Sequence, residues 1–184
     1  MRVTDLAENK GVFLMATDTD TPPMVIDARD VTLTLGETPV LRGISLRVAR
    51  GESVALLGAS GSGKSSLMAV LTGLERASGG SVTIDGLNFS ALGEDELARA
   101  RRGRIGIVLQ AFHLLTTMTA RENVAIGADR VYPKASRAER QEVVEYYLEK
   151  VGLGDSMNRL AADMSNGMRQ RVGVARAFAL SPKL

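Results

Sequence analysis

One short stretch restricts the fold of this chain more than any other: Gly58-Ala59-Ser60-Gly61-Ser62-Gly63-Lys64-Ser65. It follows a continuous apolar run, Val54–Leu57, and from Lys64 onward apolar residues recur at helical spacing. A continuous apolar run is typical of a strand covered on both faces, as in a parallel sheet. The order of strand, glycine-rich loop and helix therefore predicts an α/β fold. The helix residues expected in the core are Leu67, Met68, Val70, Leu71 and Leu74.

The loop fits the pattern G-x-x-x-x-G-K-[ST] of a phosphate-binding loop (P-loop) at every fixed position. Glycines let backbone N–H groups approach a phosphate, and the N-terminus of the following helix favours an anion. Lys64 would reach the β- and γ-phosphates of a nucleotide, and the Ser65 hydroxyl would bind Mg²⁺. A Gly/Ser-rich turn with a chance lysine is the alternative, and the flanking strand and helix argue against it. The predicted phosphate-binding residues are Gly58, Ala59, Ser60, Gly61, Ser62, Gly63, Lys64, Ser65 and Ser66.

The chain before this loop has two parts. Residues 1–24 are polar, contain Thr, Asp and Pro, and are expected to be a disordered lead-in, with Met1, Met15 and Met24 all possible starts. Apolar and polar residues then alternate over 31–35 and 44–48. Such alternation predicts half-buried strands of an antiparallel sheet.

Beyond the loop, further elements follow at ordinary spacing. Strands are expected over 82–84 and 105–109, and a charged helix over 94–102. A longer helix over 136–151 is indicated by Ser136 and Glu139, a capping-box pair, followed by one apolar stripe. A last helix over about 167–180 has Ser165 near its N-cap.

Composition restricts the class of protein. Apolar residues make up 45% and charged residues 24%, as in ordinary globular proteins. The formal net charge is only +2 and the basic residues are scattered, so we expect no nucleic-acid partner. The sequence has no cysteine, which excludes disulfides and thiolate metal sites. No apolar run approaches the roughly 20 residues of a membrane helix.

Two further segments carry a family resemblance. Ile107-Val108-Leu109-Gln110-Ala111-Phe112-His113-Leu114-Leu115 resembles the Q-loop of ABC ATPases. The stretch from Met164 to Ala177, MSNGMRQRVGVARA, resembles their signature motif and the helix behind it. With the P-loop in the same order, the resemblance covers about residues 25–184. It is similar in particular to the subfamily that serves lipoprotein-releasing and macrolide-efflux permeases, because Phe112–Leu115 followed by Met118–Val124 is typical of that group.

The resemblance implies a P-loop NTPase fold of the ABC type over 25–184, with an N-terminal antiparallel β-subdomain and a helical subdomain at about 94–166. It implies ATP and Mg²⁺ as cofactors, with Gln110 joining Ser65 in the metal shell and sensing the γ-phosphate. Residues 111–124 would contact a membrane permease. Ser165, Asn166 and Gly167 would bind the γ-phosphate of ATP held by the P-loop of a second copy, so that ATP joins two subunits. The protein would then lie in the cytoplasm, on the inner face of the cell membrane.

Plain structural alternatives stay open for the same residues. Gln110 alone could be a solvent-facing residue at a strand end. Ser165 could be an N-cap in any fold, and the cluster Arg169–Arg171 could be a solvated helix face. His113 is the single histidine and is expected at the surface or at an interface rather than as a base or metal ligand.

The sequence departs from the family pattern at three places. Asn166 replaces a glycine of the signature, which predicts a weakened contact with the partner copy's phosphate. Leu35 replaces an aromatic residue that stacks on adenine, which predicts loose base binding. Family members continue past the position of Leu184 into the Walker B strand, with an Asp, a catalytic Glu and a later His. The resemblance thus implies a chain truncated before that strand, aggregation-prone and without measurable ATPase activity by itself.

The leading interpretation is the ATP-binding subunit of an ABC transporter, an ATPase by family, driving export or lipoprotein extraction through a separate permease. One alternative is a cell-division type of regulatory ABC ATPase. Another is a non-hydrolysing nucleotide-binding module, favoured by Asn166 and by the missing acidic residues.

Overall fold

The structure is a computed structural model that describes residues 2–5, 13–16, 23–109 and 113–184. It consists of two compact units, Met1–Arg101 and Arg102–Leu184. The expected helical subdomain at about 94–166 differs from this division at both ends. Helix α2 (Glu94–Arg101) belongs to the first unit, and the second unit continues to Leu184.

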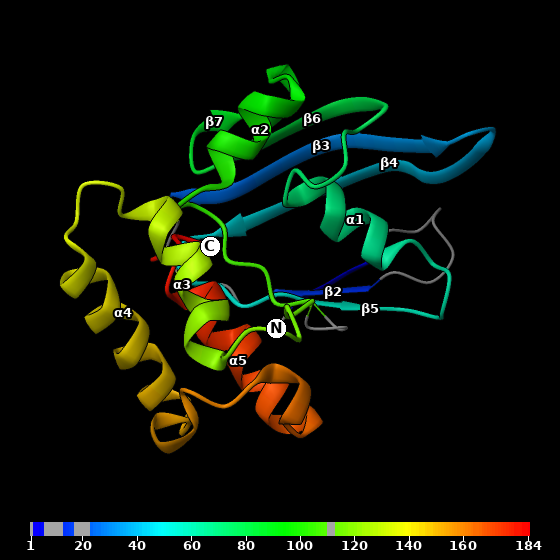
Figure 1. The fold of residues 1–184 in the computed structure, drawn as a ribbon. Helices are drawn as coiled ribbons and strands as arrows, with labels where there is room; N and C mark the ends of the chain where they lie inside the picture. Colours follow the sequence, from blue (N-terminus) through cyan, green and yellow to red (C-terminus); the bar gives the residue numbers. More distant parts are fainter. Residues whose placement is uncertain (1, 6–12, 17–22, 110–112) are drawn as a thin grey trace. The chain divides into compact units, whose positions relative to one another are not determined.

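A four-stranded antiparallel sheet with the order β4-β3-β6-β7 dominates the first unit (Figure 1). Its strands are β3 (Met24–Leu35), β4 (Thr38–Ala49), β6 (Gly79–Ile84) and β7 (Leu87–Asn88). The predicted alternation is confirmed at 31–33 and 44–48, where one side of β3 and β4 is buried, but Leu35 at the end of β3 is exposed. The buried residues of these strands include Val31, Leu33, Ile44, Leu46, Val48, Val82 and Ile84.

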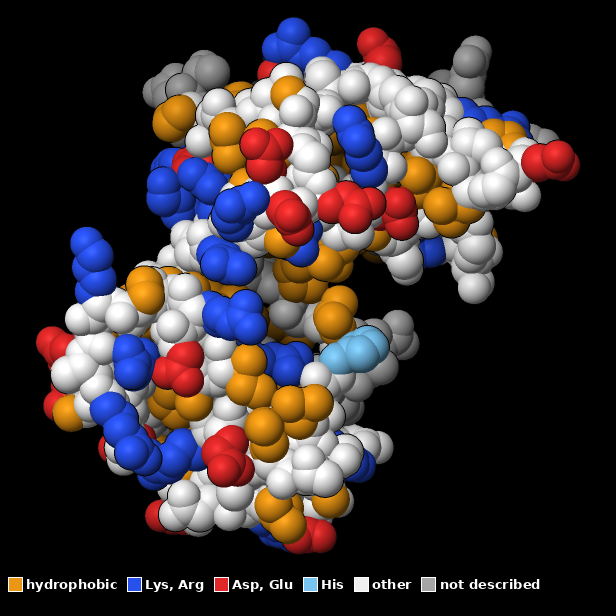
Figure 2. All heavy atoms as spheres, turned by 45° about the horizontal axis from the view of Figure 1, so that its top comes forward, with side chains coloured by type: hydrophobic (Ala, Val, Ile, Leu, Met, Phe, Trp, Pro, Cys, Tyr) orange, Lys and Arg blue, Asp and Glu red, His pale blue; other side chains and the backbone are white. Residues whose placement is uncertain are grey.

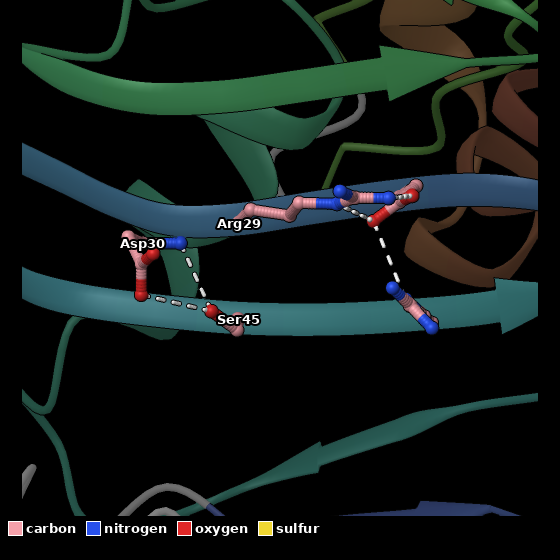
Figure 3. Close-up of polar contacts among 5 residues, drawn as sticks. Arg29, Asp30 and Ser45 are labelled. Atoms are coloured by element: carbon pink, nitrogen blue, oxygen red, sulfur yellow. Dashed lines mark hydrogen bonds and ion pairs between the residues drawn. The ribbon is translucent and has the colours of Figure 1, made fainter.

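A bulge interrupts β3 at Asp30, where its register shifts against both neighbouring strands. Asp30 has a positive φ of 48°, which a non-glycine residue adopts at a cost. Figure 3 shows Asp30 facing Ser45 of β4, whose hydroxyl oxygen accepts from the Asp30 N–H at 2.9 Å. Gly80 of β6 lies against this bulge: a Cβ there would be 2.4 Å from the Asp30 carbonyl oxygen. The bulge therefore requires glycine at position 80.

A second, three-stranded sheet has the order β1-β2-β5 and is antiparallel throughout. It contains β1 (Arg2–Asp5), β2 (Phe13–Ala16) and β5 (Ala55–Leu57). The structure thus differs from the expected disordered lead-in, because residues 13–15 form a backbone ladder with β5. The expectation that 54–57 is covered on both faces is wrong here: β5 pairs with β2, and Leu57 is 47% exposed.

Helix α1 (Lys64–Leu71) packs on the four-stranded sheet through Leu67, Val70 and Leu71, which are buried as expected. Met68 and Leu74 are about half exposed, which corrects the predicted core list. Met68 lies off the stripe formed by 67, 70 and 71, and the helix ends before Leu74 is reached. The short helix η1 (Phe89–Ala91) and α2 complete this unit.

The second unit consists of helices. Its elements are α3 (Ala120–Val131), α4 (Arg137–Lys150), η2 (Gly154–Ser156), η3 (Ala161–Asp163) and α5 (Asn166–Phe178). Helices α4 and α5 confirm the predicted ones within two residues at each end. Helix α3 was not predicted, although Thr119 and Glu122 form a capping box at its start. One apolar cluster joins the three long helices through residues such as Val124, Val144, Leu148, Val172 and Ala175.

The predicted strand over 105–109 is not a strand in this structure. A strand needs a hydrogen-bonded neighbour along its length. In the described part of the chain the backbone bonds of this stretch are limited to its start. The Arg104 carbonyl accepts from the Lys183 and Leu184 N–H groups at 2.9 and 3.0 Å, and the Gly106 N–H donates to the Leu184 carbonyl at 2.9 Å.

The surface carries mixed charge. On the face shown in Figure 2, basic and acidic side chains are interspersed with hydrophobic ones. Among the described residues, none of the helices combines the length and the apolarity that crossing a membrane would demand.

Gly80→Ala tests the bulge. Its Cβ would strain a φ of 81° and press on backbone of β3, so we expect a loss of about 2–5 kcal/mol of unfolding free energy. Gly43→Ala is the matched control, because Gly43 has the same φ of 81° and open space around it. Urea denaturation should show Gly80→Ala to be the more damaging by at least about 1 kcal/mol. Equal losses would contradict the close approach to Asp30.

The two capping boxes predict a loss of stability in acid. The pKa values of Glu122 and Glu139 are held below their ordinary value of 4.5, chiefly by the backbone N–H groups of Thr119 and Ser136. A lowered folded-state pKa adds stability that is fully present above pH 4.5 and is lost as the pH falls through the folded pKa. Replacing both residues by Gln, which keeps the caps, should flatten the acid slope of denaturation midpoints. An unchanged slope would rule the caps out as its source.

Candidate functional site

The predicted phosphate-binding residues form the loop after β5 and the first turn of α1. Gly61 and Gly63 have φ angles of 79° and 89°, values that favour glycine. Gly63 is the N-cap of α1, and no side chain caps the helix there. A Cβ at Gly63 would also lie 3.2 Å from the Leu41 side chain and 3.3 Å from the Val40 carbonyl oxygen. The loop therefore presents an uncapped helix N-terminus, which attracts anions.

Lys64 places a positive charge inside this loop. Its Nζ donates to the carbonyl oxygens of Gly58 at 2.9 Å and Ala59 at 2.6 Å, and to the Ser62 hydroxyl at 3.3 Å. The side chain is half-buried, while residues 58–61 are exposed. The ammonium is thus held at the loop and not extended into solvent. A phosphate that bound here would meet backbone N–H groups, a helix N-terminus and one cation together.

The start of α1 also offers oxygen for a metal ion. Ser65 is exposed and Ser66 is half-buried, both in the first turn of α1. In nucleotide sites Mg²⁺ takes one or two protein oxygens and completes its shell with phosphate and water. A single hydroxyl next to the phosphate loop therefore fits Mg²⁺. Gln110, the other predicted metal residue, lies outside the described residues.

The three predicted residues of the signature segment lie together at the start of α5. The Ser165 hydroxyl caps this helix by accepting from the Met168 N–H at 3.3 Å. Asn166 is the first helical residue, and its φ is not positive. Its Oδ1 accepts from the Arg169 guanidinium at 2.9 Å. A Cβ at Gly167 would meet nothing within 4 Å.

The structure assembles these residues in two groups. Residues 58–66 form one loop and helix start in the first unit, and 165–167 form one helix start in the second unit. Leu35, at the predicted adenine position, ends β3 and is 49% exposed. His113 is exposed, as expected.

Two polar residues that sequence reasoning missed hold residues 113–119 in place. Asn123 is fully buried, and its amide makes hydrogen bonds only to backbone groups among the contacts described. Arg176 of α5 donates to the His113 carbonyl oxygen at 2.9 Å, and burial lowers its pKa. Asn123 sits among residues with a family resemblance, but its burial could not be read from the sequence. The capping pair Thr119 and Glu122 was the one local signal that α3 begins there.

Comparison with known proteins places this geometry in a family. The model of the ABC transporter family matches residues 41–184. The chain is 45% identical to the macrolide export ATP-binding/permease protein MacB of Marinobacter nauticus, over 85% of the chain and 25% of that protein. It is 43% identical to the methionine import ATP-binding protein MetN of Brucella abortus, over 86% of the chain and 42% of that protein. With the lipoprotein-releasing system ATP-binding protein LolD of Anaeromyxobacter dehalogenans it shares 45% identity, over 80% of the chain and 61% of that protein.

The chain thus spans from a quarter to about three fifths of the length of these relatives. Among solved structures, it resembles the dimeric ATP-binding cassette MJ0796 in a post-hydrolysis state bound to ADP and Pi. The TM-score is 0.77 at 32% identity, covering 85% of this chain and 70% of that one. Because the family model matches well over half of its residues, this chain belongs to the ABC transporter family.

Proposed function

We propose that this chain binds Mg·ATP through residues 58–66 and forms the ATP-binding, energy-coupling part of an ABC transporter. The observation that carries the proposal is the start of α1: an uncapped helix N-terminus, opened by Gly63, beside the Lys64 ammonium held at the loop. Both features are positive and attract an anion, and the triphosphate of ATP carries the negative charge that would pair with them.

Each residue has a separate task in this proposal. The N–H groups of the loop and of the first turn of α1 would bind the phosphates, which Gly61 and Gly63 allow through their positive φ. Lys64 would leave the Gly58 and Ala59 carbonyl oxygens for the β- and γ-phosphates. The Ser65 hydroxyl would hold Mg²⁺, whose chemistry is to neutralise phosphate charge. On the basis of the sequence motif alone, we also propose Gln110 as a ligand of Mg²⁺.

A second copy would complete the site. We propose that Ser165, Asn166 and Gly167 contact the γ-phosphate of ATP bound to a partner copy, giving an ATP-dependent homodimer. Support comes from the exposed N-terminus of α5, where these residues lie, and from a structural relative described as dimeric. The Ser165 hydroxyl, now the helix cap, would be shared between Met168 N–H and phosphate.

The proposed partner in transport is a separate membrane permease, contacted by residues 111–124, with the chain lying on the inner face of the cell membrane. Two relatives, named for macrolide export and for lipoprotein release, support export or lipoprotein extraction. Other relatives are named for methionine import, so export rather than import is our proposal. ATP hydrolysis is proposed from family membership. The absence of ATPase activity from these residues alone stays a prediction. An assay of phosphate release by the purified chain would test it.

Lys64→Ala tests nucleotide binding. Removing the ammonium deletes charge-assisted contacts to phosphate of about 1.5–3 kcal/mol, so we expect ATP affinity to fall by about tenfold to a hundredfold. Titration calorimetry with ATP on the full chain measures it. Lys134→Ala is the control, because Lys134 is an exposed lysine of the second unit.

Ser65→Ala separates the metal from the phosphate. This variant should bind ATP more weakly than the wild type when Mg²⁺ is present and equally well when a chelator removes it. Wild-type chain that is folded and shows no affinity for Mg·ATP would refute the proposed function.

Asn166→Gly tests the contact with the partner copy. It removes a side chain where the partner's phosphate should arrive, so the dissociation constant of the ATP-bound dimer should fall by about threefold to tenfold, or roughly 1 kcal/mol. Analytical ultracentrifugation with ATP measures this constant. Asn158→Gly, at another exposed position of the second unit, should leave it unchanged. An identical constant for Asn166→Gly would show that the side chain does not hinder pairing.

A further inference from the structure

The loop 113–119 is hydrogen-bonded directly to the stretch that leads into Ser165. The Thr116 carbonyl oxygen accepts from the Ala162 N–H at 3.1 Å, and the Met118 carbonyl oxygen accepts from the Ala161 N–H at 2.9 Å. Thr119 forms an antiparallel bridge with Leu160. Helix η3 and Met164 then connect this stretch to the Ser165 cap, three residues beyond Ala162. Any change in the loop's shape therefore moves acceptors on which 160–165 depends.

A single buried amide sets the shape of this loop. The Asn123 Nδ2 donates to the carbonyl oxygens of Leu115 at 3.0 Å, Met118 at 3.3 Å and Thr119 at 2.9 Å. Its Oδ1 accepts from the Leu115 N–H at 2.8 Å. Asn123 is fully buried in α3, so these contacts have no competition from water. One side chain thus satisfies both ends of a five-residue turn.

The other end of the loop is held from α5. His113 has a positive φ of 45°, a backbone conformation that surrounding contacts must maintain. Its carbonyl oxygen accepts from the Arg176 Nη1 at 2.9 Å. Arg176 lies in the last turn of the helix whose first residue follows Ser165. The helix that begins at the proposed phosphate contact therefore also holds the start of the loop.

We propose that Asn123 is a positioning residue that couples loop 113–119 to the Ser165 cap, with Arg176 holding the His113 end of the same loop. The inference rests on the proposed function in one respect: 113–119 belongs to the proposed permease contact, and Ser165 to the proposed phosphate contact. The two polar anchors, Asn123 and Arg176, fix the loop, and its backbone bonds to Ala161 and Ala162 then make η3 and the start of α5 follow it. A permease that displaces the loop would thereby displace Ser165.

Asn123→Asp tests the coupling with almost no change of shape. The carboxylate still accepts from the Leu115 N–H but turns an oxygen toward three carbonyl oxygens. We expect backbone amides in 113–119 and in 159–164 to exchange with deuterium about tenfold faster or more, because both segments lose the same anchor. Amides of β3 and α1, and the affinity for Mg·ATP, should stay unchanged.

The pH dependence of the exchange ratio distinguishes loss of this anchor from a general loosening of the fold. The partners of the amide are backbone groups, which do not titrate in this range. Burial should raise the pKa of the introduced carboxyl, and its protonated form can donate one hydrogen bond again. The exchange ratio of variant to wild type should therefore fall toward one as the pH is lowered. Asn158→Asp is the matched control, since the oxygen of exposed Asn158 accepts from Arg121 Nε at 3.3 Å, which a carboxylate also does.

Three results would overturn the proposal: faster exchange in 113–119 without any change in 159–164, equal acceleration throughout the core residues of α4 and α5, or a ratio independent of pH. Arg176→Lys, which keeps the charge and loses the planar guanidinium, should speed exchange mainly at 113–116. No change there would remove Arg176 from the proposal. Wild-type chain that fails to bind Mg·ATP would defeat the proposed function, while the exchange pattern would still decide the role of Asn123.

Discussion

Backbone groups left unpaired at the start of a helix are the constraint on which the candidate site depends. Helix α1 begins at Gly63 without a side-chain cap, so its first N–H groups need another acceptor. Most helices satisfy these groups with Ser, Thr, Asp or Asn, as α3, α4 and α5 do with Thr119, Ser136 and Ser165. At α1 a glycine stands at the N-cap position, and the Lys64 ammonium lies nearby. Without a capping side chain the helix start is less stable, but its N–H groups stay available to an anion.

The second unit solves the same problem of backbone pairing in a different way. Its loop 113–119 is irregular, so its backbone groups find no partners in a helix or sheet ladder and need side chains or water instead. Asn123 supplies two donors and one acceptor from inside α3, and Arg176 supplies another donor from α5. Backbone hydrogen bonds from Ala161 and Ala162 join the same loop to the stretch before α5. Stability and the proposed coupling therefore both depend on the shape of this loop.

Much of this could be predicted locally. The alternation over 31–33 and 44–48, the capping box at Ser136 and Glu139, and the N-cap Ser165 depend on neighbouring residues only, and the structure confirms them. The errors share a cause. The apolar run at 54–57 predicts a covered strand, but the strand's surroundings depend on which partners pair with it, and here β5 pairs with β2. The stretch 105–109 fails as a strand for the same reason. Leu74 was assigned to the core because the end of α1 was not foreseen.

The sequence by itself determined the local geometry at 58–66, because the motif is contiguous and its glycine φ angles and lysine contacts involve only a few neighbouring residues. It also determined the fold family through three motifs in a fixed order. Only the tertiary structure decided that Asn123 is buried and bonded to a loop up to eight residues away, and that Arg176 reaches His113 across 63 positions. Such contacts depend on which elements pack together, and the packing partners cannot be inferred from the residue types alone.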